Sequence, residues 1–450
     1  MAAAWELLSA GAHVTVFEAG PRLGGCIRTE DVAGRPVDLG PDAFLARVPH
    51  GLDLCRELGL GDEVVHPAAS GAAVWARGRL RPLPGGLVLG VPTGPRDLVG
   101  LVRAGLVTPA GAARAALDLV RPATRWEADP SVADVVVARL GRQVHTGVVD
   151  PLVGGIHAGR SDRLSARAAA PQLADGARAR SLMRGVRAAR HAAGGGGSPG
   201  AVAGVPIGPP PLFASLRGGL GRLVERAEEA LRAGGATVVT GTAVTEAAVA
   251  GFDATVVATP APVTARLVAA ASPEAADALS GIEYASVALA VLVYPGSALG
   301  RGLAGTGFLV PAAEGRLLTA CSYASAKWPH WAGGGDVVLR ASAGRWGDDR
   351  ALALDDDALC DRLHGELSSA LGLSQAPRIH RVTRWEGAFP QYRPGHLARV
   401  ERAEAAVARD LPGVTLAGAA YRGVGIAACV AQGRDAARRA LAGAGRSGPS

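Results

Sequence analysis

An acidic residue, Glu18, stands at the end of a short strand that follows a helical segment at the start of the chain. Residues 2–10 have the character of helical turns, Gly11 ends that helix, and residues 12–18 read as the strand. A carboxylate at the end of the second strand of a βαβ unit can accept hydrogen bonds from ribose hydroxyls. The pattern therefore predicts that Glu18 binds a nucleotide.

The residues that would hold the pyrophosphate of this nucleotide are not found before the helix. A complete unit has an earlier strand and a G-x-G-x-x-G turn, whose N–H groups bind the phosphates together with the helix N-terminus. The chain as given starts with Met1, where the helix is already under way. We therefore expect the sheet to lack its first strand and chain 1–450 to bind the cofactor poorly or to misfold. Either the start was assigned too late or the phosphate cradle has been lost.

The loop after Glu18 combines two adjacent glycines with two arginines. Gly24 and Gly25 would let the backbone approach a phosphate closely, and Arg22 and Arg28 could supply positive charge to it. A Gly-Gly pair alone would predict no more than a surface turn. With the helix, the strand and the acid in register before it, the loop predicts a phosphate-binding segment.

A second glycine-rich loop lies near the other end of the chain, between a predicted strand and a predicted helix. The loop begins at Gly418, and the helix begins at Gly425. A helix N-terminus presents free N–H groups and the positive end of its dipole. The loop is therefore a second candidate for cofactor contact, with an ordinary βα turn as the alternative. A third and weaker signal is the apolar strand at 254–258, which runs into Ala-Thr-Pro.

Together these segments resemble the flavin-containing amine oxidase superfamily, whose pattern E-x-x-x-R-x-G-G-x-x-R-T is followed by residues 18–29. Longer stretches resemble one branch of it, the protoporphyrinogen and coproporphyrinogen oxidases of haem synthesis, and most of all the soluble form from Gram-positive bacteria. These stretches are residues 35–47, 84–93, 151–165, 325–329 and 385–396. The resemblance covers nearly the whole chain, from residue 2 to about residue 440.

The resemblance implies an α/β fold with three parts. A discontinuous Rossmann-like FAD-binding domain, without its first strand and glycine turn, is combined with an antiparallel-sheet substrate domain and a helical insert. We expect the FAD-binding domain at 1–72, 212–265 and 400–450, the substrate domain at 73–94 and 266–399, the insert at 95–190 and a flexible loop at 191–211. The loop prediction rests on its runs of glycine and proline.

FAD is the cofactor that the resemblance implies. Val244 matches the residue whose backbone would contact the adenine. Arg47, Arg81 and Arg96 are expected to pair with substrate carboxylates through bidentate hydrogen bonds. The residues expected to bind FAD are Glu18, Ala19, Arg22, Gly24, Gly25, Arg28, Gly40, Pro41, Asp42, Val244, Trp385, Gly418, Gly425, Ile426 and Ala427.

The sequence assigns no catalytic residue. Lys327, the only lysine in the chain, is either close to flavin N5, as a lysine is in amine-oxidising relatives, or a surface residue. His396 is either a structural histidine or a site residue. The absence of an obvious acid–base pair or nucleophilic triad suits an enzyme whose cofactor carries the chemistry.

The implied reaction is the oxidation of a porphyrinogen to a porphyrin by oxygen, with release of hydrogen peroxide. Six hydrogens leave in three rounds, each as a hydride to the flavin and a proton from a pyrrole N–H. Coproporphyrinogen III, whose four propionates suit a basic pocket, is the expected substrate, and coproporphyrin III is the product. The alternatives are a protoporphyrinogen IX oxidase, an N-terminally truncated inactive remnant of either enzyme, or another amine-oxidase-like enzyme such as a carotenoid desaturase.

Composition agrees with a large globular α/β protein, with 48% hydrophobic residues and 63 glycines. The net charge of +7 is compatible with an anionic substrate, and no basic run indicates nucleic acid. Five scattered cysteines without a C-x-x-C pair, and histidines without metal-ligand spacing, predict a cytoplasmic protein without a metal site. No signal peptide and no apolar run of ~18 residues are found. The sequence does not predict an oligomeric state.

Overall fold

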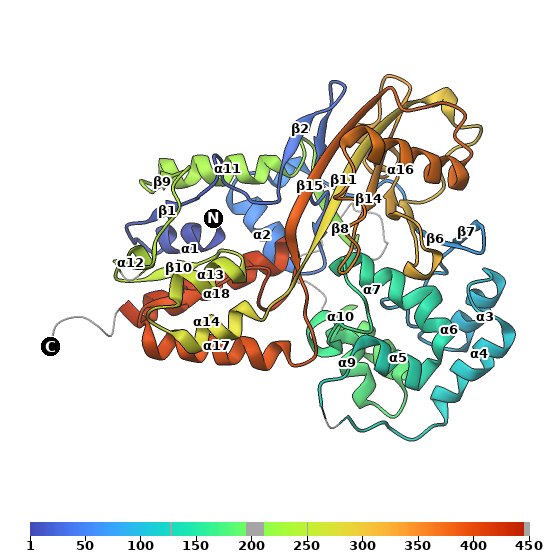
Figure 1. Ribbon diagram of the computed structural model, residues 1–450, viewed down its shortest axis with the longest axis horizontal. Helices are drawn as coiled ribbons and strands as arrows, with labels where there is room; N and C mark the ends of the chain where they lie inside the picture. The colour runs from blue at the N-terminus through green and yellow to red at the C-terminus, as the bar shows by residue number, and fades with distance from the viewer. Residues whose placement is uncertain (127, 195–210, 250, 445–450) are drawn as a thin grey trace, which may run out of the picture. The chain divides into compact units, whose positions relative to one another are not determined.

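The computed structural model describes residues 1–126, 128–194, 211–249 and 251–444. They form a mixed α/β protein, as predicted (Figure 1). The predicted flexible loop at 191–211 lies mostly outside the described residues. The chain divides into two compact units: unit 1 comprises Met1–His66, Pro210–Glu283 and His396–Ser450, and unit 2 comprises Pro67–Pro209 and Tyr284–Gly395.

Unit 1 is assembled from three separate parts of the sequence. Its helices are α1 (Ala2–Ser9), α2 (Pro49–Glu57), α11 (Gly221–Ala233), α12 (Glu246–Val249), α13 (Ala261–Val268), α14 (Pro273–Ser280), α17 (His396–Asp410) and α18 (Ile426–Ala444). Its strands are β1 (Thr15–Phe17), β2 (Thr29–Asp31), β3 (Pro36–Asp38), β4 (Phe44–Leu45), β5 (Val64–Val65), β8 (Phe213–Leu216), β9 (Thr237–Val239), β10 (Thr255–Val257) and β16 (Val414–Leu416).

Unit 2 combines one large sheet with a group of helices. Its strands are β6 (Ala73–Ala76), β7 (Arg79–Pro82), β11 (Tyr284–Pro295), β12 (Gly307–Leu309), β13 (Leu318–Ser322), β14 (Asp336–Ala343) and β15 (Ile379–Pro390). Its helices are α3 (Pro95–Arg103), α4 (Pro109–Ala116), α5 (Val132–Leu140), α6 (Arg142–Val144), α7 (Asp150–His157), α8 (Ala166–Ala169), α9 (Pro171–Arg178), α10 (Leu182–Gly194), α15 (Ala324–Lys327) and α16 (Asp356–Leu371).

Residues 266–283, which we expected in the substrate domain, lie in unit 1. The reason is the packing of α14 against α17. Ser272, just before α14, donates a hydrogen bond of 2.6 Å to Asp410 Oδ2 at the end of α17, and Arg399 of α17 donates to the carbonyl of Ala278. The expected insert at 95–190 lies within unit 2, and its separation as a third domain remains a prediction.

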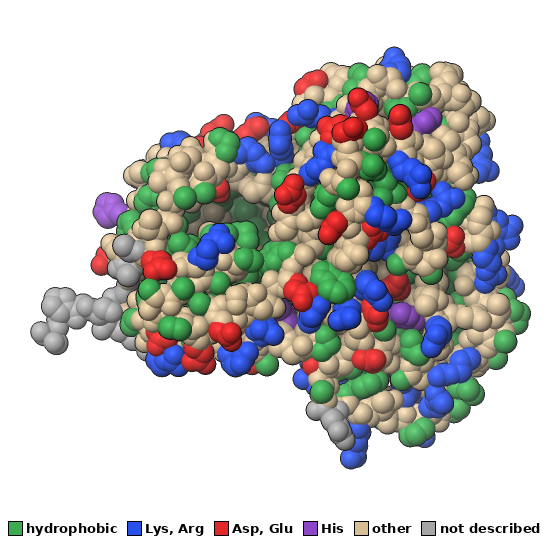
Figure 2. Space-filling model, viewed as in Figure 1, with side chains coloured by type: hydrophobic (Ala, Val, Ile, Leu, Met, Phe, Trp, Pro, Cys, Tyr) green, Lys and Arg blue, Asp and Glu red, His purple; other side chains and the backbone are tan. Residues whose placement is uncertain are grey.

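The parallel strands of unit 1 form two separate pairs. β1 pairs with β9, and β10 pairs with β16. Among the described strands, none joins the two pairs into one continuous sheet. Helix α18 packs against β10 and β16, and it also packs against α1, the helix that precedes β1 in the chain. Figure 2 shows the face of unit 1 hollowed near the place where Figure 1 marks the start of the chain.

The close approach of α1 to α18 depends on a glycine. A Cβ atom on Gly433 of α18 would lie 3.2 Å from the backbone nitrogen of Ala3, which is tighter than most side-chain contacts. A side chain at this position would push the two helices apart. Gly433 therefore fixes how near the first helix lies to the last helix of the chain.

The sheet of unit 2 has seven strands in the order β15-β11-β14-β13-β12-β6-β7. All neighbouring strands are antiparallel except β12 and β6. β11 is buried over almost its whole length because β14 and β15 pair with its two edges. The predicted hairpin at 73–84 is formed by β6 and β7, with left-handed backbone at Arg77 and Gly78 in its turn.

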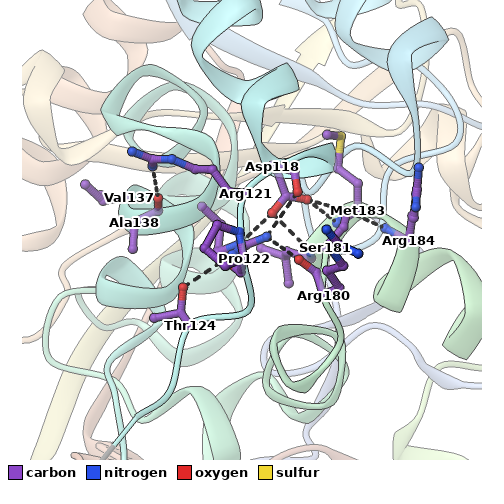
Figure 3. Close-up of polar contacts among 12 residues, drawn as sticks. Asp118, Arg121, Pro122, Thr124, Val137, Ala138, Arg180, Ser181, Met183 and Arg184 are labelled. Atoms are coloured by element: carbon purple, nitrogen blue, oxygen red, sulfur yellow. Dashed lines mark hydrogen bonds and ion pairs between the residues drawn. The ribbon is translucent and has the colours of Figure 1, made fainter.

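A fully buried carboxylate, Asp118, connects three segments of the helical part of unit 2 (Figure 3). It accepts hydrogen bonds from Arg139 Nε at 2.5 Å and from the Ser181 hydroxyl at 2.6 Å. It also accepts the backbone N–H groups of Leu182 and Met183, the first residues of α10. Asp118 therefore both pairs with a buried cation and caps the start of α10.

The guanidinium of Arg139 also has several hydrogen-bond acceptors. Beyond its contact with the Asp118 carboxylate, it donates to the carbonyls of Pro122 and Arg180, each at 2.6 Å, and to the Asp118 carbonyl at 3.0 Å. A buried ion pair of this kind is stable because every polar atom has a partner. Removing either member would leave the other charged and buried.

Candidate functional site

Glu18 lies at the carboxyl ends of β1 and β9, where nucleotide ligands bind in open α/β sheets. Its carboxylate oxygen Oε1 accepts the N–H of Gly20 at 2.8 Å. The N–H of Gly241 donates to the carbonyl of Gly20 at 2.8 Å, and that of Thr242 donates to the carbonyl of Glu18 at 3.0 Å. Glu18 is half-buried, and within the described residues its second oxygen has no hydrogen-bond partner. That oxygen is free to accept a ligand hydroxyl.

Two further segments of unit 1, the start of α1 and the segment that contains Val244, are related to Glu18. Burial lowers the pKa of the Met1 amine, and the Glu18 carboxylate opposes this shift, so the start of α1 is within electrostatic range of the acid. The half-buried Val244 follows the segment at 241–242 that is hydrogen-bonded to Glu18 and Gly20. A contact between its backbone and an adenine remains a prediction.

The side chain of Arg22 is bound to its own loop. Its guanidinium donates to the carbonyls of Leu23 at 3.0 Å, Gly25 at 2.7 Å and Ile27 at 2.9 Å. These bonds close the loop that follows the exposed Ala19. Sequence reasoning treated Arg22 as a charge offered to phosphate, and the structure adds that it holds the loop in shape.

Arg28 is directed to a different partner, since it forms an ion pair with Glu30. Beyond it, the Thr29 hydroxyl donates to the buried Asp38 at 2.5 Å, and Asp38 accepts the N–H of Leu220 at 2.8 Å. Leu220 is the N-cap residue of α11. The hairpin of β2 and β3 therefore anchors the first turn of α11.

The two adjacent glycines have different roles. Gly24 has φ +98°, and a Cβ there would lie 2.6 Å from a methyl group of Val224 in α11. Gly25 has φ +56°, and a Cβ there would meet no atom within 4 Å. Gly24 is needed for packing, whereas the backbone of Gly25 borders open space that a ligand can occupy.

Replacing Gly24 by alanine is expected to lower the free energy of unfolding by about 1–3 kcal/mol, because the added methyl group overpacks against Val224. The double variant Gly24→Ala/Val224→Ala removes the clash but keeps the strained backbone. The loss of unfolding free energy in the double variant should therefore be smaller than the sum of the losses in Gly24→Ala and Val224→Ala. Urea unfolding followed by circular dichroism measures both values. Strictly additive effects of the two substitutions would show that the contact is not the cause.

Gly40, Pro41 and Asp42 follow β3 in unit 1 and are half-buried. The N–H of Leu39 donates to the carbonyl of Arg28 at 2.8 Å, which ties this segment to the glycine-rich loop. β4, which comes directly afterwards, packs against α18. Gly40, Pro41 and Asp42, which we expected to bind FAD, therefore lie between a residue bonded to the glycine-rich loop and a strand that packs against α18.

The C-terminal loop joins β16 to α18 and contains Gly418, Gly423 and Gly425, all in left-handed or related conformations. A Cβ on Gly425 would meet no atom within 4 Å. Ile426 and Ala427 form the first turn of α18, where no acidic residue offsets the positive end of the helix dipole. The predicted contact residues thus lie at an open helix N-terminus.

Two side chains hold this loop in place. Nε2 of the buried His396 is 2.8 Å from the carbonyl of Tyr421, so His396 has a structural hydrogen bond. Gln432 of α18 accepts the N–H of Arg422 at 3.1 Å and donates to the carbonyl of Gly423 at 3.2 Å. Sequence reasoning missed Gln432, because a glutamine inside a helix carries no signal until the loop folds back onto it.

The two ends of the chain meet in one apolar cluster of unit 1. Met1 and Ile27, from the N-terminal segment, pack against the same buried cluster as Ile426, and Val430 is one of its buried members. The glycine-rich loop at 24–27 and the first turn of α18 therefore each contribute a residue to this cluster. Burial also raises the pKa of Cys429 to about 11, so this nearby thiol stays protonated and is no nucleophile at neutral pH.

The remaining candidates belong to both units. Arg47 is an exposed residue of unit 1, and Arg96 is an exposed residue of unit 2. Trp385 is half-buried in β15, opposite Val287 of β11. Lys327 ends α15, with Nζ 5.0 Å from the centroid of the Trp328 ring. Their roles in binding remain predictions.

Arg81 is committed to the fold of unit 2. Its guanidinium donates to the carbonyls of Ala76 at 3.0 Å and Ala104 at 3.2 Å. Burial lowers its pKa, and the neighbouring Arg79 and Arg77 lower it further. The side chain therefore has less capacity for a substrate carboxylate than the sequence suggested.

The residues of unit 1 suit a dinucleotide such as FAD. Glu18 offers a carboxylate oxygen to hydroxyl groups, and Gly25 and Gly425 border open space. The N-terminus of α18 offers N–H groups to an electron-rich ligand. No group of three or more His, Cys, Asp or Glu side chains able to hold a metal ion occurs among the described residues. A search of the same residues finds no helix that could span a membrane.

The chain is similar to known proteins over nearly its whole length. The family model described as "flavin containing amine oxidoreductase" matches residues 1–441. The coproporphyrinogen III oxidase of Bacillus subtilis is 32% identical over 442 residues, covering 95% of this chain and 92% of that protein. The coproporphyrinogen III oxidase of Mycobacterium tuberculosis is 36% identical over 429 residues, covering 93% and 89% respectively.

Solved structures show the same fold. A protein of Exiguobacterium sp. 255-15, provisionally named a protoporphyrinogen oxidase, superimposes with a TM-score of 0.81 at 29% identity, over 98% of this chain and 96% of that one. A reduced UDP-galactopyranose mutase superimposes with a TM-score of 0.69 at 16% identity, over 98% and 91%. The second likeness concerns the fold alone.

Proposed function

The chain belongs to the flavin containing amine oxidoreductase family, and from this membership we propose that it is an FAD-dependent oxidase converting coproporphyrinogen III to coproporphyrin III in haem biosynthesis. The observation that carries the proposal is 32–36% identity, over 93–95% of this chain, to bacterial enzymes named for that substrate. The nucleotide-type arrangement around Glu18 in unit 1 is its structural support.

Unit 1 supplies the residues that would hold FAD. Glu18 would accept hydrogen bonds from ribose hydroxyls through its open oxygen, and the segment that contains Val244 would border the adenine. The backbone around Gly25 would face the phosphates. Gly425 and the first N–H groups of α18 would contact the polar atoms of the flavin end. Bound FAD would supply the hydride acceptor that the chain's own side chains lack.

The reaction removes six hydrogens from the porphyrinogen in three two-electron steps. Each step removes one hydride from a C–H bond and one proton, and proton shifts between carbon and nitrogen complete the product. Over the three steps the meso carbons lose four hydrogens and the pyrrole nitrogens lose two. Three molecules of oxygen take up these electrons and protons and leave as three molecules of hydrogen peroxide. The protein's task is to position the macrocycle and exclude water, since the sequence shows no dedicated nucleophile.

A tetra-anionic substrate suits the charge distribution of the chain. Residues 95–194 contain fifteen arginines and eight acidic residues, which give this segment the net charge of the whole chain, +7. Figure 2 shows basic side chains spread over the face of these helices. A positive field of this kind raises the rate at which anions reach a protein. The four propionates of coproporphyrinogen III would feel it more than the two of protoporphyrinogen IX.

Protoporphyrinogen IX is the second candidate substrate. The protoporphyrinogen oxidase of Bos taurus is 30% identical over 470 residues, covering 95% of this chain and 93% of that protein. We favour the tetrapropionate because the bacterial relatives named for it reach 36% identity. We also infer a cytoplasmic location, supported by five free cysteines among the described residues.

The test is a comparison of both porphyrinogens in air, with the full chain and added FAD. The proposal predicts a higher kcat/KM for coproporphyrinogen III, followed by porphyrin fluorescence, with three peroxides formed per porphyrin. A higher kcat/KM for protoporphyrinogen IX would replace the substrate assignment. No porphyrin from an FAD-loaded protein would contradict the proposed activity itself.

A further inference from the structure

Unit 2 contains a cavity of about 630 Å³ that the proposed function leaves without a role. Its size lies within the usual range of small-molecule sites. Titratable side chains from three regions of the unit line it: the helical region around α7, the segment between β12 and β13, and the loop that follows β14. They include His145, Asp150, Arg160, Arg316, Arg345 and Asp348.

Three of the four acidic groups of the lining are engaged with other partners, whereas the exposed Asp349 has no side-chain hydrogen bond or ion pair among the described residues. Asp150 accepts the hydroxyl of Ser161, which also lies 2.8 Å from His145 Nε2. Asp162 accepts two hydrogen bonds from Arg160, at 3.1 and 2.8 Å. Asp348 accepts two from Arg350, at 2.8 and 2.7 Å. These pairs leave the negative charges of Asp162 and Asp348 compensated by cations other than Arg345.

Arg316, another cation of the lining, is occupied as well. It lies 4.3 Å from the centroid of the Trp75 ring and donates to the carbonyl of Glu366 and the hydroxyl of Ser369, each at 3.3 Å. A ligand would have to break these contacts before Arg316 could bind it.

Arg345 differs from the other arginines of the lining. It is half-buried, and within the described part of the chain its guanidinium has no hydrogen bond and no ion pair. Burial lowers its pKa and the Arg350 guanidinium lowers it further, while the carboxylates of Asp348 and Asp150 act against this shift. A desolvated guanidinium without a direct partner gains more from binding an anion than one already paired.

The surroundings of Arg345 add positive charge. The ring of the next residue, Trp346, has Arg163 at 5.4 Å and Arg393 at 5.1 Å from its centroid. Both arginines stack on the indole and stay close to the cavity lining of which Trp346 is a part. An anionic group bound at Arg345 would therefore meet one guanidinium without a direct partner, with two further cations beside Trp346 and with the carboxylates of Asp150, Asp348 and Asp349 also in the lining.

We propose that this cavity binds a carboxylate group of the tetrapyrrole, with Arg345 as its charge partner. The inference rests on the proposed function and names a residue that would favour a substrate with four propionates over one with two. A guanidinium suits this task because it can donate two parallel hydrogen bonds to one carboxylate. The shared chemistry is a carboxylate, carried either by the tetrapyrrole or by a small free acid.

The test is a titration of the full chain, loaded with FAD, with coproporphyrin III, followed by porphyrin fluorescence. Arg345→Gln should weaken binding about tenfold, the loss expected for one charge-assisted pair, and Arg345→Lys should lie in between because it keeps only the charge. Arg362→Gln is the matched control. It removes the same charge from an exposed side chain of α16, 3.8 Å from Glu366, and should leave the dissociation constant unchanged. Matching thermal melts confirm that both variants fold.

Titrations with protoporphyrin IX and competition with succinate distinguish a tetrapyrrole carboxylate from a small free acid. A propionate of the tetrapyrrole is supported if Arg345→Gln raises the dissociation constant less for protoporphyrin IX than for coproporphyrin III. Succinate should then not compete with either porphyrin. Competition by succinate in wild type but not in Arg345→Gln supports a site for small carboxylates. The inference would be overturned if Arg345→Gln binds coproporphyrin III as tightly as the wild type, or if Arg362→Gln weakens this binding equally. The proposed function would still stand if the wild type forms porphyrin. A wild type that neither binds nor oxidises a tetrapyrrole would overturn both.

Discussion

Replacing Asp118 by alanine is expected to lower the free energy of unfolding by about 3–5 kcal/mol, because it leaves the buried Arg139 without a counter-charge. The same substitution removes the acceptor for the Ser181 hydroxyl and for two backbone N–H groups at the start of α10. Each of these donors is buried, so none regains a full hydrogen bond from water. Thermal and urea unfolding measure the loss.

Asp175→Ala is the control for this prediction. Asp175 pairs with Arg178 at 3.0 Å in α9, and its side chain is 61% exposed. Exposed pairs of this kind contribute little, and about 0.5 kcal/mol or less is expected here. If Asp118→Ala unfolds at the same temperature as Asp175→Ala, the buried network does not stabilise the helical part of unit 2.

Replacing Glu18 by alanine is expected to weaken FAD binding by roughly 10- to 100-fold, the factor that corresponds to one hydrogen bond to a charged group. The carboxylate lies at the shared edge of β1 and β9, with one oxygen engaged by Gly20 and one open to a ligand. Glu18→Gln should lose less, because an amide oxygen still accepts a hydrogen bond. Quenching of flavin fluorescence during titration gives the dissociation constants.

Glu225→Ala is the matched variant for Glu18. It removes the same charge from unit 1, at an exposed position of α11 where Arg222 keeps a second partner in Glu63. Its dissociation constant for FAD should equal that of the wild type. Equal affinity in Glu18→Ala and wild type would mean that the acid does not contact the nucleotide.

Local patterns were sufficient to predict the fold class and the two ends of the candidate cofactor site. Glu18 follows a recognisable strand, and Gly425 precedes a recognisable helix, so each could be placed from its neighbours in the sequence. That both belong to one site rested on the family resemblance, because Ile27 and Ile426, which pack against the same buried cluster, are about four hundred positions apart.

The arginines could not be assigned in the same way. The sequence presents Arg22, Arg81 and Arg345 as equivalent basic residues, yet their functions depend on partners that only the folded chain supplies. Arg22 binds its own loop, Arg81 binds carbonyls 5 and 23 positions away, and Arg345 lies in a cavity, without a hydrogen bond or ion pair among the described residues. The Asp118 network escaped prediction for the same reason, since its donors come from positions 21 to 65 residues further along.

The most direct test of the account is to mix the FAD-loaded chain with coproporphyrinogen III in the absence of oxygen. If the chain oxidises porphyrinogens through FAD, the visible absorbance of the oxidised flavin disappears while oxidised tetrapyrrole forms in proportion. The absorbance then returns when oxygen is admitted. An unchanged flavin spectrum with an unchanged porphyrinogen would contradict the claim that this chain oxidises porphyrinogens through FAD.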